Sequence, residues 1–106
     1  MPKKTRAYEK DLTKRLKDAT YASEYLNAVM EDHEEGDDVE ERFLIALRDV
    51  AKAHGISQLS EKTELWRKSL YKVLSSEGNP RLDTLIALLN AMGLMMRVGA
   101  RKKRAF

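Results

Sequence analysis

The residues best suited to do chemistry lie together in one short stretch, TELWRKSLYKVLSS, at positions 63–76. Arg67, Lys68 and Lys72 place three positive charges within two helical turns, and Tyr71 adds an aromatic ring with a hydroxyl group. A guanidinium group can form paired hydrogen bonds with a phosphate or with O6 and N7 of guanine. A tyrosine can pack on a sugar or on a thymine methyl group. These residue types suit a surface that binds nucleic acid, and they also suit an ordinary solvated helix face.

The spacing of the apolar residues in this stretch predicts a helix over residues 67–74. Leu70, Val73 and Leu74 recur at the helical period and turn toward a core, which leaves the basic residues on an outer face without an acid. Leu65 stands where it can form a hydrophobic staple with Leu70 and fix the angle at which the chain enters the helix. The positive end of the helix dipole adds to the charge of the outer face, so the start of this helix favours an anion.

A short helix upstream completes a known arrangement. Ser57 can cap a helix over residues 57–62, and a turn of roughly four residues then leads into helix 67–74. Two such helices form a helix-turn-helix motif, whose second helix reads the major groove of DNA. Gln58, at the start of the first helix, could reach a backbone phosphate. The loop after the second helix adds two polar residues on the side that should approach the duplex, Asn79 and Arg81.

Helical spacing also dominates the rest of the chain, and strand patterns are nearly absent. The further helices are predicted over residues 21–32, 39–53 and 82–91, with Gly78-Asn79-Pro80 as a turn before the last one. The predicted inward-facing residues are Ala22, Tyr25, Leu26, Val29 and Met30, then Phe43, Leu44, Leu47, Val50 and Ala51, then Leu82, Leu85, Ile86, Leu89 and Met92. The fold class that follows is an all-α domain of about five helices.

Three cap signals set the predicted bounds of these helices. Thr20 is a candidate N-cap for helix 21–32. Asp38 and Glu41 form the pattern of a capping box at the start of helix 39–53. Gly55 is expected to end that helix in a left-handed conformation.

The domain organisation follows from the same patterns. Residues 1–17 are basic and weakly patterned and could be partly mobile, residues 18–98 form the helix-turn-helix domain, and residues 99–106 form a basic tail. Leu94–Val98 favours a short strand at an edge, which could pair across a homodimer. The last helix and this segment together are the predicted dimer interface.

Composition excludes several classes of protein. The 106 residues suit one domain with one core, and no apolar run approaches the roughly 18 residues that span a bilayer. No apolar signal core follows the basic N-terminus, and there is no cysteine, so a cytoplasmic protein without disulfides is expected. No nucleophile–base pair, phosphate-cradling glycine loop or spaced carboxylate pair is present, so we expect neither an enzyme nor a cofactor.

The acidic stretch at residues 31–41 has two open interpretations. It could be a solvated surface, or it could bind a basic partner and speed their association. A metal site can be imagined from Glu31, Asp32, His33 and Glu35, but their spacing matches no known ligand pattern, and we expect no metal.

One segment resembles a known family. GISQLSEKTELWRKSLYKVLSSEGNPRLDTLIALLNAMGL, residues 55–94, is similar to the helix-turn-helix addiction-module antidote proteins, in the antitoxin branch related to HigA within the Xre or lambda-repressor-like group. Residues 55–59, 69–72, 78–80 and 82–85 carry the match. Residues 23–55 also resemble the two leading helices of that family, so that the likeness covers roughly residues 18–98.

The resemblance implies a cytoplasmic antitoxin that binds and neutralises a toxin similar to the RelE/ParE proteins. It also implies a homodimer that binds an operator of two-fold symmetry and represses its own operon. On this basis the expected DNA-binding residues are Gln58, Arg67, Lys68, Ser69, Tyr71, Lys72, Asn79 and Arg81. A toxin-neutralising protein with weakened DNA binding and a stand-alone Xre-type regulator are the alternatives.

Two residues depart from the family pattern. Glu64 stands where the family usually has a glycine in the turn, so that either Glu64 adopts a conformation costly for a residue with a side chain or the turn differs. Trp66 stands where a small capping residue is usual, and an indole cannot accept hydrogen bonds from the first amides of the helix. These changes could be neutral, could alter the DNA contact, or could reduce DNA affinity while toxin binding is kept.

Overall fold

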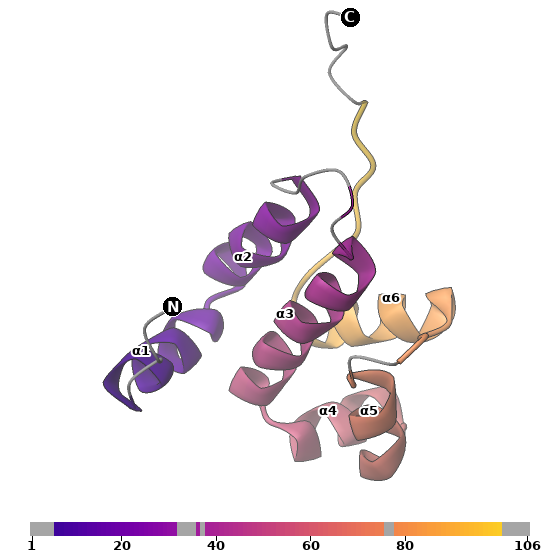
Figure 1. Cartoon of the computed structure of the whole chain (residues 1–106). Helices are drawn as coiled ribbons and strands as arrows, with labels where there is room; N and C mark the ends of the chain where they lie inside the picture. The colour runs from indigo at the N-terminus through magenta and orange to yellow at the C-terminus, as the bar shows by residue number, and fades with distance from the viewer. Residues whose placement is uncertain (1–5, 32–35, 37, 76–77, 101–106) are drawn as a thin grey trace, which may run out of the picture.

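The structure of the chain is a computed structural model that describes residues 6–31, 36, 38–75 and 78–100. Over these residues the chain forms six α-helices and no strand, which confirms the predicted all-α class (Figure 1). The helices are α1 (Arg6–Leu16), α2 (Ala19–Glu31), α3 (Val39–His54), α4 (Ile56–Thr63), α5 (Arg67–Val73) and α6 (Leu82–Ala91).

Helix α3 lies at the centre of the fold. Leu47, Val50 and Ala51 of α3 are completely buried, because α1 and α2 pack against it and α4 follows it directly. Helix α4 in turn contacts α5 and α6, so that the helix-turn-helix pair and the last helix form the opposite end of the molecule from α1 (Figure 1). The other helices contribute Leu16, Ala22, Leu26, Leu59, Leu70, Leu88 and Leu89 to the same core.

The boundary between α3 and α4 is a single residue. The backbone amide of Gly55 donates to the carbonyl of Ala51 at 2.9 Å and closes α3, while its own carbonyl accepts from Leu59 N at 3.1 Å and opens α4. Gly55 has a φ of +99°, as predicted in sign, but its ψ of 120° lies outside the left-handed helical region. Because α4 already begins at Ile56, Ser57 lies within its first turn, and its prediction as the cap is wrong.

The other two predicted caps have different outcomes. At the start of α3 the carboxylate Oδ1 of Asp38 accepts a hydrogen bond from the amide of Glu41 at 2.9 Å, which confirms Asp38 as the N-cap. Helix α2 begins at Ala19, before the predicted residue 21. Its first carbonyl acceptor is Asp18, which bonds the amide of Ala22 at 2.9 Å, and the Asp18 side chain accepts from Thr20 N at 3.3 Å. Asp18 therefore replaces Thr20 as the residue that begins this helix.

Two structural features at the ends of the chain differ from the sequence-based expectation. Residues 6–16 form α1, a helix that the weak pattern of the segment did not predict, and Leu16 at its end is 1% exposed in the core. At the other end, residues 94–98 form no strand in the described chain, and only Leu94 of that segment is buried. Figure 1 shows the chain after α6 as an extended trace that leads away from the helices.

Helix α6 has the predicted bounds, and of its predicted inward-facing residues Leu85, Leu89 and Met92 lie in or against the core. Leu88, Leu89 and Met92 are buried, whereas Leu82 is 64% exposed and Ile86 is 40% exposed. The prediction that Leu82 and Ile86 face inward is therefore wrong. In α2, similarly, Ala22 and Leu26 are buried as predicted, but the Met30 side chain lies largely outside the core.

Candidate nucleic-acid interface

All eight residues that the sequence proposed for DNA binding are exposed. Six of them lie on the helix-turn-helix pair, one at the start of α4 and five on α5, and the other two follow in the loop before α6. The set is Gln58 on α4, Arg67, Lys68, Ser69, Tyr71 and Lys72 on α5, and Asn79 and Arg81 in the loop.

Helix α5 divides into a buried and an exposed face. Leu70 and, at the C-cap, Leu74 are almost completely buried, and they fix the helix on the core. Arg67, Lys68 and Lys72 are exposed, and the ring of Tyr71 is 52% exposed. The outer face of α5 therefore carries three cations and one amphipathic ring, and no acidic residue lies within the helix.

The turn between α4 and α5 is held by side-chain hydrogen bonds from α4. The Ser60 hydroxyl donates to the carbonyl of Leu65, and the Thr63 hydroxyl donates to the carbonyl of Leu59 at 2.6 Å. The amide of Leu65 donates back to Thr63 Oγ1 at 3.3 Å. Sequence reasoning missed these two residues. The available signal was a serine and a threonine three positions apart in the last turn of a short helix.

Glu64 adopts the left-handed conformation that its position demands. Its φ of 61° and ψ of 16° make it the only non-glycine residue with a positive φ among the described residues. Of the two alternatives drawn from the sequence, the structure therefore shows the one in which the turn is kept and Glu64 bears the strain. A residue with a Cβ pays roughly 1–2 kcal/mol for this conformation.

Trp66 is the N-cap residue of α5, with an extended backbone at φ −66° and ψ 144°. Its carbonyl accepts the first helical hydrogen bond, from Leu70 N at 3.0 Å, but its side chain makes no capping bond. The indole is 81% exposed. Both expectations about Trp66 are confirmed: it precedes the helix, and it leaves the first amides without a side-chain acceptor.

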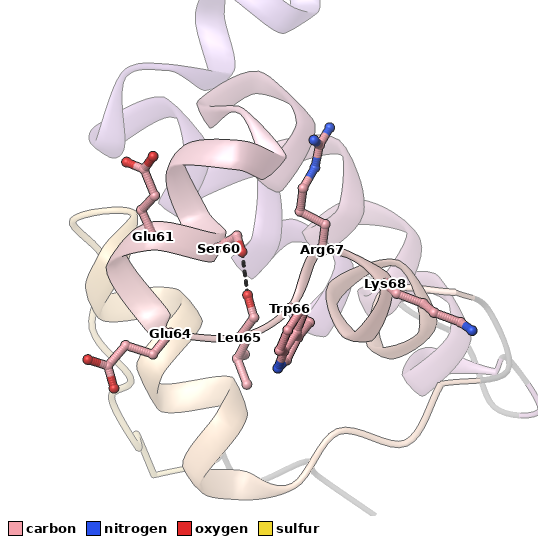
Figure 2. Close-up of a pocket in the computed structure, with 7 residues that line it drawn as sticks. All are labelled: Ser60, Glu61, Glu64, Leu65, Trp66, Arg67 and Lys68. Atoms are coloured by element: carbon pink, nitrogen blue, oxygen red, sulfur yellow. Dashed lines mark hydrogen bonds between the residues drawn. The ribbon is translucent and has the colours of Figure 1, made fainter.

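A shallow, open hollow lies between the end of α4 and the start of α5 (Figure 2). Figure 2 shows Glu61 and Glu64 on the α4 side of this hollow and Arg67 and Lys68 on the α5 side, with the Trp66 ring between the two groups. Its lining consists of Ser60, Glu61, Glu64, Leu65, Trp66, Arg67 and Lys68. The hollow thus has an acidic rim, a basic rim and an exposed aromatic ring.

The loop after α5 is fixed by close backbone contact. A Cβ at Gly78 would lie 2.2 Å from the carbonyl oxygen of Val73, so only glycine fits there, and the Gly78 amide donates to Ser75 O at 2.9 Å. The loop presents Asn79 and Arg81 to solvent. Arg81 Nε lies 3.3 Å from Asp83 Oδ1 in an exposed ion pair, which costs little to break on binding a phosphate.

Two partly buried polar side chains, Tyr25 and His54, lie elsewhere and belong to the scaffold. The Tyr25 hydroxyl of α2 donates to Asp49 Oδ2 of α3 at 2.8 Å, and burial together with this carboxylate raises the pKa of Tyr25 far above its usual value. Burial, followed by the nearby Lys62, lowers the pKa of His54, whose Nε2 has no hydrogen-bond partner in the described chain. The charged form of His54 is therefore disfavoured, although His54 ends α3, where the helix dipole favours a cation.

Part of the acidic stretch, residues 32–35 and 37, lies outside the described residues. Of the imagined metal ligands only Glu31 is described, and Asp32, His33 and Glu35 are not. In the part of the chain that is described, no group of three or more histidine, cysteine or carboxylate residues could hold a metal ion. Among the same residues, no helix is both long and apolar enough to cross a membrane.

Comparison with known proteins identifies the family. Residues 6–100 match the family described as "Probable addiction module antidote protein". An uncharacterised protein of Haemophilus influenzae is 35% identical over 74 residues, which are 70% of this chain and 71% of that protein. No solved structure matched the chain. The match spans α1 to α6 and includes the proposed interface, and the chain therefore belongs to the family of probable addiction module antidote proteins.

Proposed function

We propose that this antidote binds operator DNA through α4 and α5 and represses its own operon, and that it neutralises a cognate toxin of the RelE/ParE type. The observation that carries the DNA-binding half is the exposed outer face of α5, with Arg67, Lys68 and Lys72 beside Tyr71 and no acid within the helix. A short helix that lies in a major groove presents such a face to phosphates and base edges.

The two helices divide the expected contacts. Gln58 on α4 approaches the backbone phosphate, because the first helix of such a pair crosses the backbone. Its side chain lies near Gly55, where a Cβ would be 3.9 Å from Gln58 Cδ. Arg67, Lys68 and Ser69 are at the start of α5, where base edges are reached. Lys72, Asn79 and Arg81 then flank the helix as phosphate contacts.

The proposal includes a homodimer. Two-fold symmetric operators are bound by two copies whose recognition helices lie about 34–36 Å apart. Exposed apolar side chains gather on α6 and on the segment after it, and they support this region as the contact between the copies. They are Leu82, Ile86, Met95, Met96 and Val98.

A gel-shift or anisotropy titration on the DNA upstream of the protein's own reading frame tests the DNA-binding half. The affinity should fall with salt, with a log–log slope of about 0.9 per phosphate contacted. Arg67→Ala should weaken specific binding by about 1–3 kcal/mol if Arg67 reads a base. Lys14→Ala is the matched control, because Lys14 is an exposed cation on α1, at the far end of the molecule (Figure 1). If no specific complex forms at low salt, the proposal that this protein represses its own operon is wrong.

A second candidate function is favoured by the turn between the helices. Glu64 adds a negative charge beside the basic face, and Trp66 offers no cap, so the chain could neutralise a toxin while it binds DNA weakly. In that case the parent protein and Arg67→Ala should neutralise the toxin equally, and neither should retain upstream DNA at physiological salt. The reading frame next to this gene separates both functions from a stand-alone regulator, because only an antidote needs a toxin encoded beside it.

A further inference from the structure

Trp66 is the feature of the interface that neither helix formation nor the core explains. It is the single tryptophan of the chain, and 81% of its side chain is exposed at the start of α5. Large aromatic residues usually bury most of their surface, and tryptophan is enriched where a surface binds a partner. Here the ring contributes no cap and almost no packing to the folded chain.

The backbone that carries this ring is well fixed. The Ser60 hydroxyl binds the carbonyl of Leu65, the residue directly before Trp66, and Leu65 N is bonded to Thr63 Oγ1 at 3.3 Å. On the other side, the Trp66 carbonyl accepts from Leu70 N at 3.0 Å, and Leu70 is completely buried. The indole is thus presented from a constrained turn, which lowers the entropy lost when it meets a partner.

The position of the Trp66 ring and the charged residues beside it indicate which part of a DNA duplex the ring contacts. Arg67 and Lys68 follow it directly on the basic rim of the hollow, and Glu61 and Glu64 lie on the other rim, where their charge would repel phosphates (Figure 2). Because Trp66 stands directly before the first residue of α5, and the start of a recognition helix meets base edges, the ring is expected to face the floor of the groove. The largest apolar group exposed on that floor is the 5-methyl group of thymine.

We propose that the indole of Trp66 packs against a thymine methyl group in each half of the operator, so that Trp66 is a specificity-determining residue. This inference rests on the proposed DNA-binding function. It assigns to Trp66 a contact by shape and apolar surface, in place of the hydrogen bonds that a small capping residue could form.

The test replaces thymine by uracil, which removes the methyl group and keeps base pairing. The probe is a duplex from the DNA upstream of the reading frame, trimmed to the footprint of the protein, with each thymine replaced in turn. At one thymine in each half-site the parent protein should lose about fourfold in affinity, the value of one buried methyl group. Trp66→Ser and Trp66→Ala should bind the thymine and uracil duplexes equally, and Trp66→Phe should keep part of the discrimination.

Fluorescence gives a second readout, because Trp66 is the single tryptophan of the chain and all indole emission comes from it. In the free protein acrylamide should quench this emission readily, and in the specific complex the quenching should fall severalfold.

If the protein binds the duplex specifically while Trp66 stays open to acrylamide, or if no uracil weakens binding, the inference is overturned and the DNA-binding function stands. If no duplex binds specifically, both fail. If a toxin shields Trp66 and DNA does not, the ring belongs to a protein interface and the inference fails.

Discussion

At the scale of single residues, the turn between α4 and α5 combines a strained residue with bonds that hold it in place. Glu64 stands in the left-handed region, and Ser60 and Thr63 both bond the backbone of Leu65, the residue directly after it. A glycine there would have no Cβ and would relieve the strain, but it would also gain freedom in the unfolded chain. The net effect of the substitution can therefore be measured as a difference in the free energy of unfolding.

We expect Glu64→Gly to raise the free energy of unfolding by about 0.5–1 kcal/mol, because the relief of about 1–2 kcal/mol is partly offset by the entropy of glycine. Denaturant titration measures this change directly. Glu64→Gln is the matched control, since it keeps the Cβ and removes the charge. Equal stability of the two variants would contradict the assignment of strain to the backbone of Glu64. Equal gains in DNA affinity would show that the charge, which both remove, acts at the interface.

The exposure of the proposed interface residues could be predicted from sequence more fully than the turn that positions them. The five proposed residues on α5 are exposed because helical periodicity, once the core side of α5 is known, fixes which side chains face solvent. The bond from Ser60 to the Leu65 carbonyl could not be predicted, because it joins residues five apart across a change of chain direction. Ser57 was misassigned for a related reason: its type suits a cap, but Gly55 already ends one helix and begins the next.

At the scale of elements, α1 is a helix whose own sequence contributes little to its stability. The segment RAYEKDLTKRL is mostly charged, and its inward side chains are chiefly Leu12 and Leu16. An isolated helix of 11 residues is marginal in water, so most of its stability must come from packing on α3 and α2. A local ion pair, Arg15 Nε to Asp11 Oδ2 at 2.9 Å, adds a few tenths of a kcal/mol at most.

We expect Leu16→Ala to lower the free energy of unfolding by about 2–4 kcal/mol, because Leu16 is 1% exposed and its loss leaves a cavity in the core. The measurement is a urea or thermal unfolding curve. Lys14→Ala serves as control in the same helix, since Lys14 is exposed and alanine keeps the helix propensity. If both variants unfold together with the parent protein, α1 does not belong to the cooperative domain, and residues 1–17 are a separate segment as the sequence suggested.

Helix α6 shows a second limit of pattern-based prediction. Its sequence, LDTLIALLNA, is apolar around most of its circumference, so periodicity could place the helix but not select its inner face. The contact with α4 determines the inner face. It buries Leu88 and Leu89 and leaves Leu82 and Ile86 exposed. The apolar residues that remain exposed are then available to another surface.

At the scale of the whole molecule, the unpaired apolar side chains and the basic face lie on different elements. Leu82 and Ile86 stand one helical turn apart on α6, whereas the cations of the proposed interface lie on α5. Leu82 in particular contributes little to the core of its own chain, with 64% of its surface exposed. A second copy that covers α6 would leave α5 of both copies free to meet DNA.

We expect the parent protein to be a dimer at micromolar concentration. The variant Leu82→Glu should be a folded monomer, because two acids would face each other across the two-fold contact of a symmetric interface. Sedimentation equilibrium or light scattering over a range of concentrations measures the mass, and circular dichroism checks that the helices are kept. Ala28→Glu is the control, since it adds the same charge at an exposed position on α2. The monomer should also bind a duplex with both half-sites no more tightly than one with a single half-site, because it loses the linkage between them. A parent protein that stays monomeric, or a Leu82→Glu protein that stays dimeric, would remove α6 as the contact between copies.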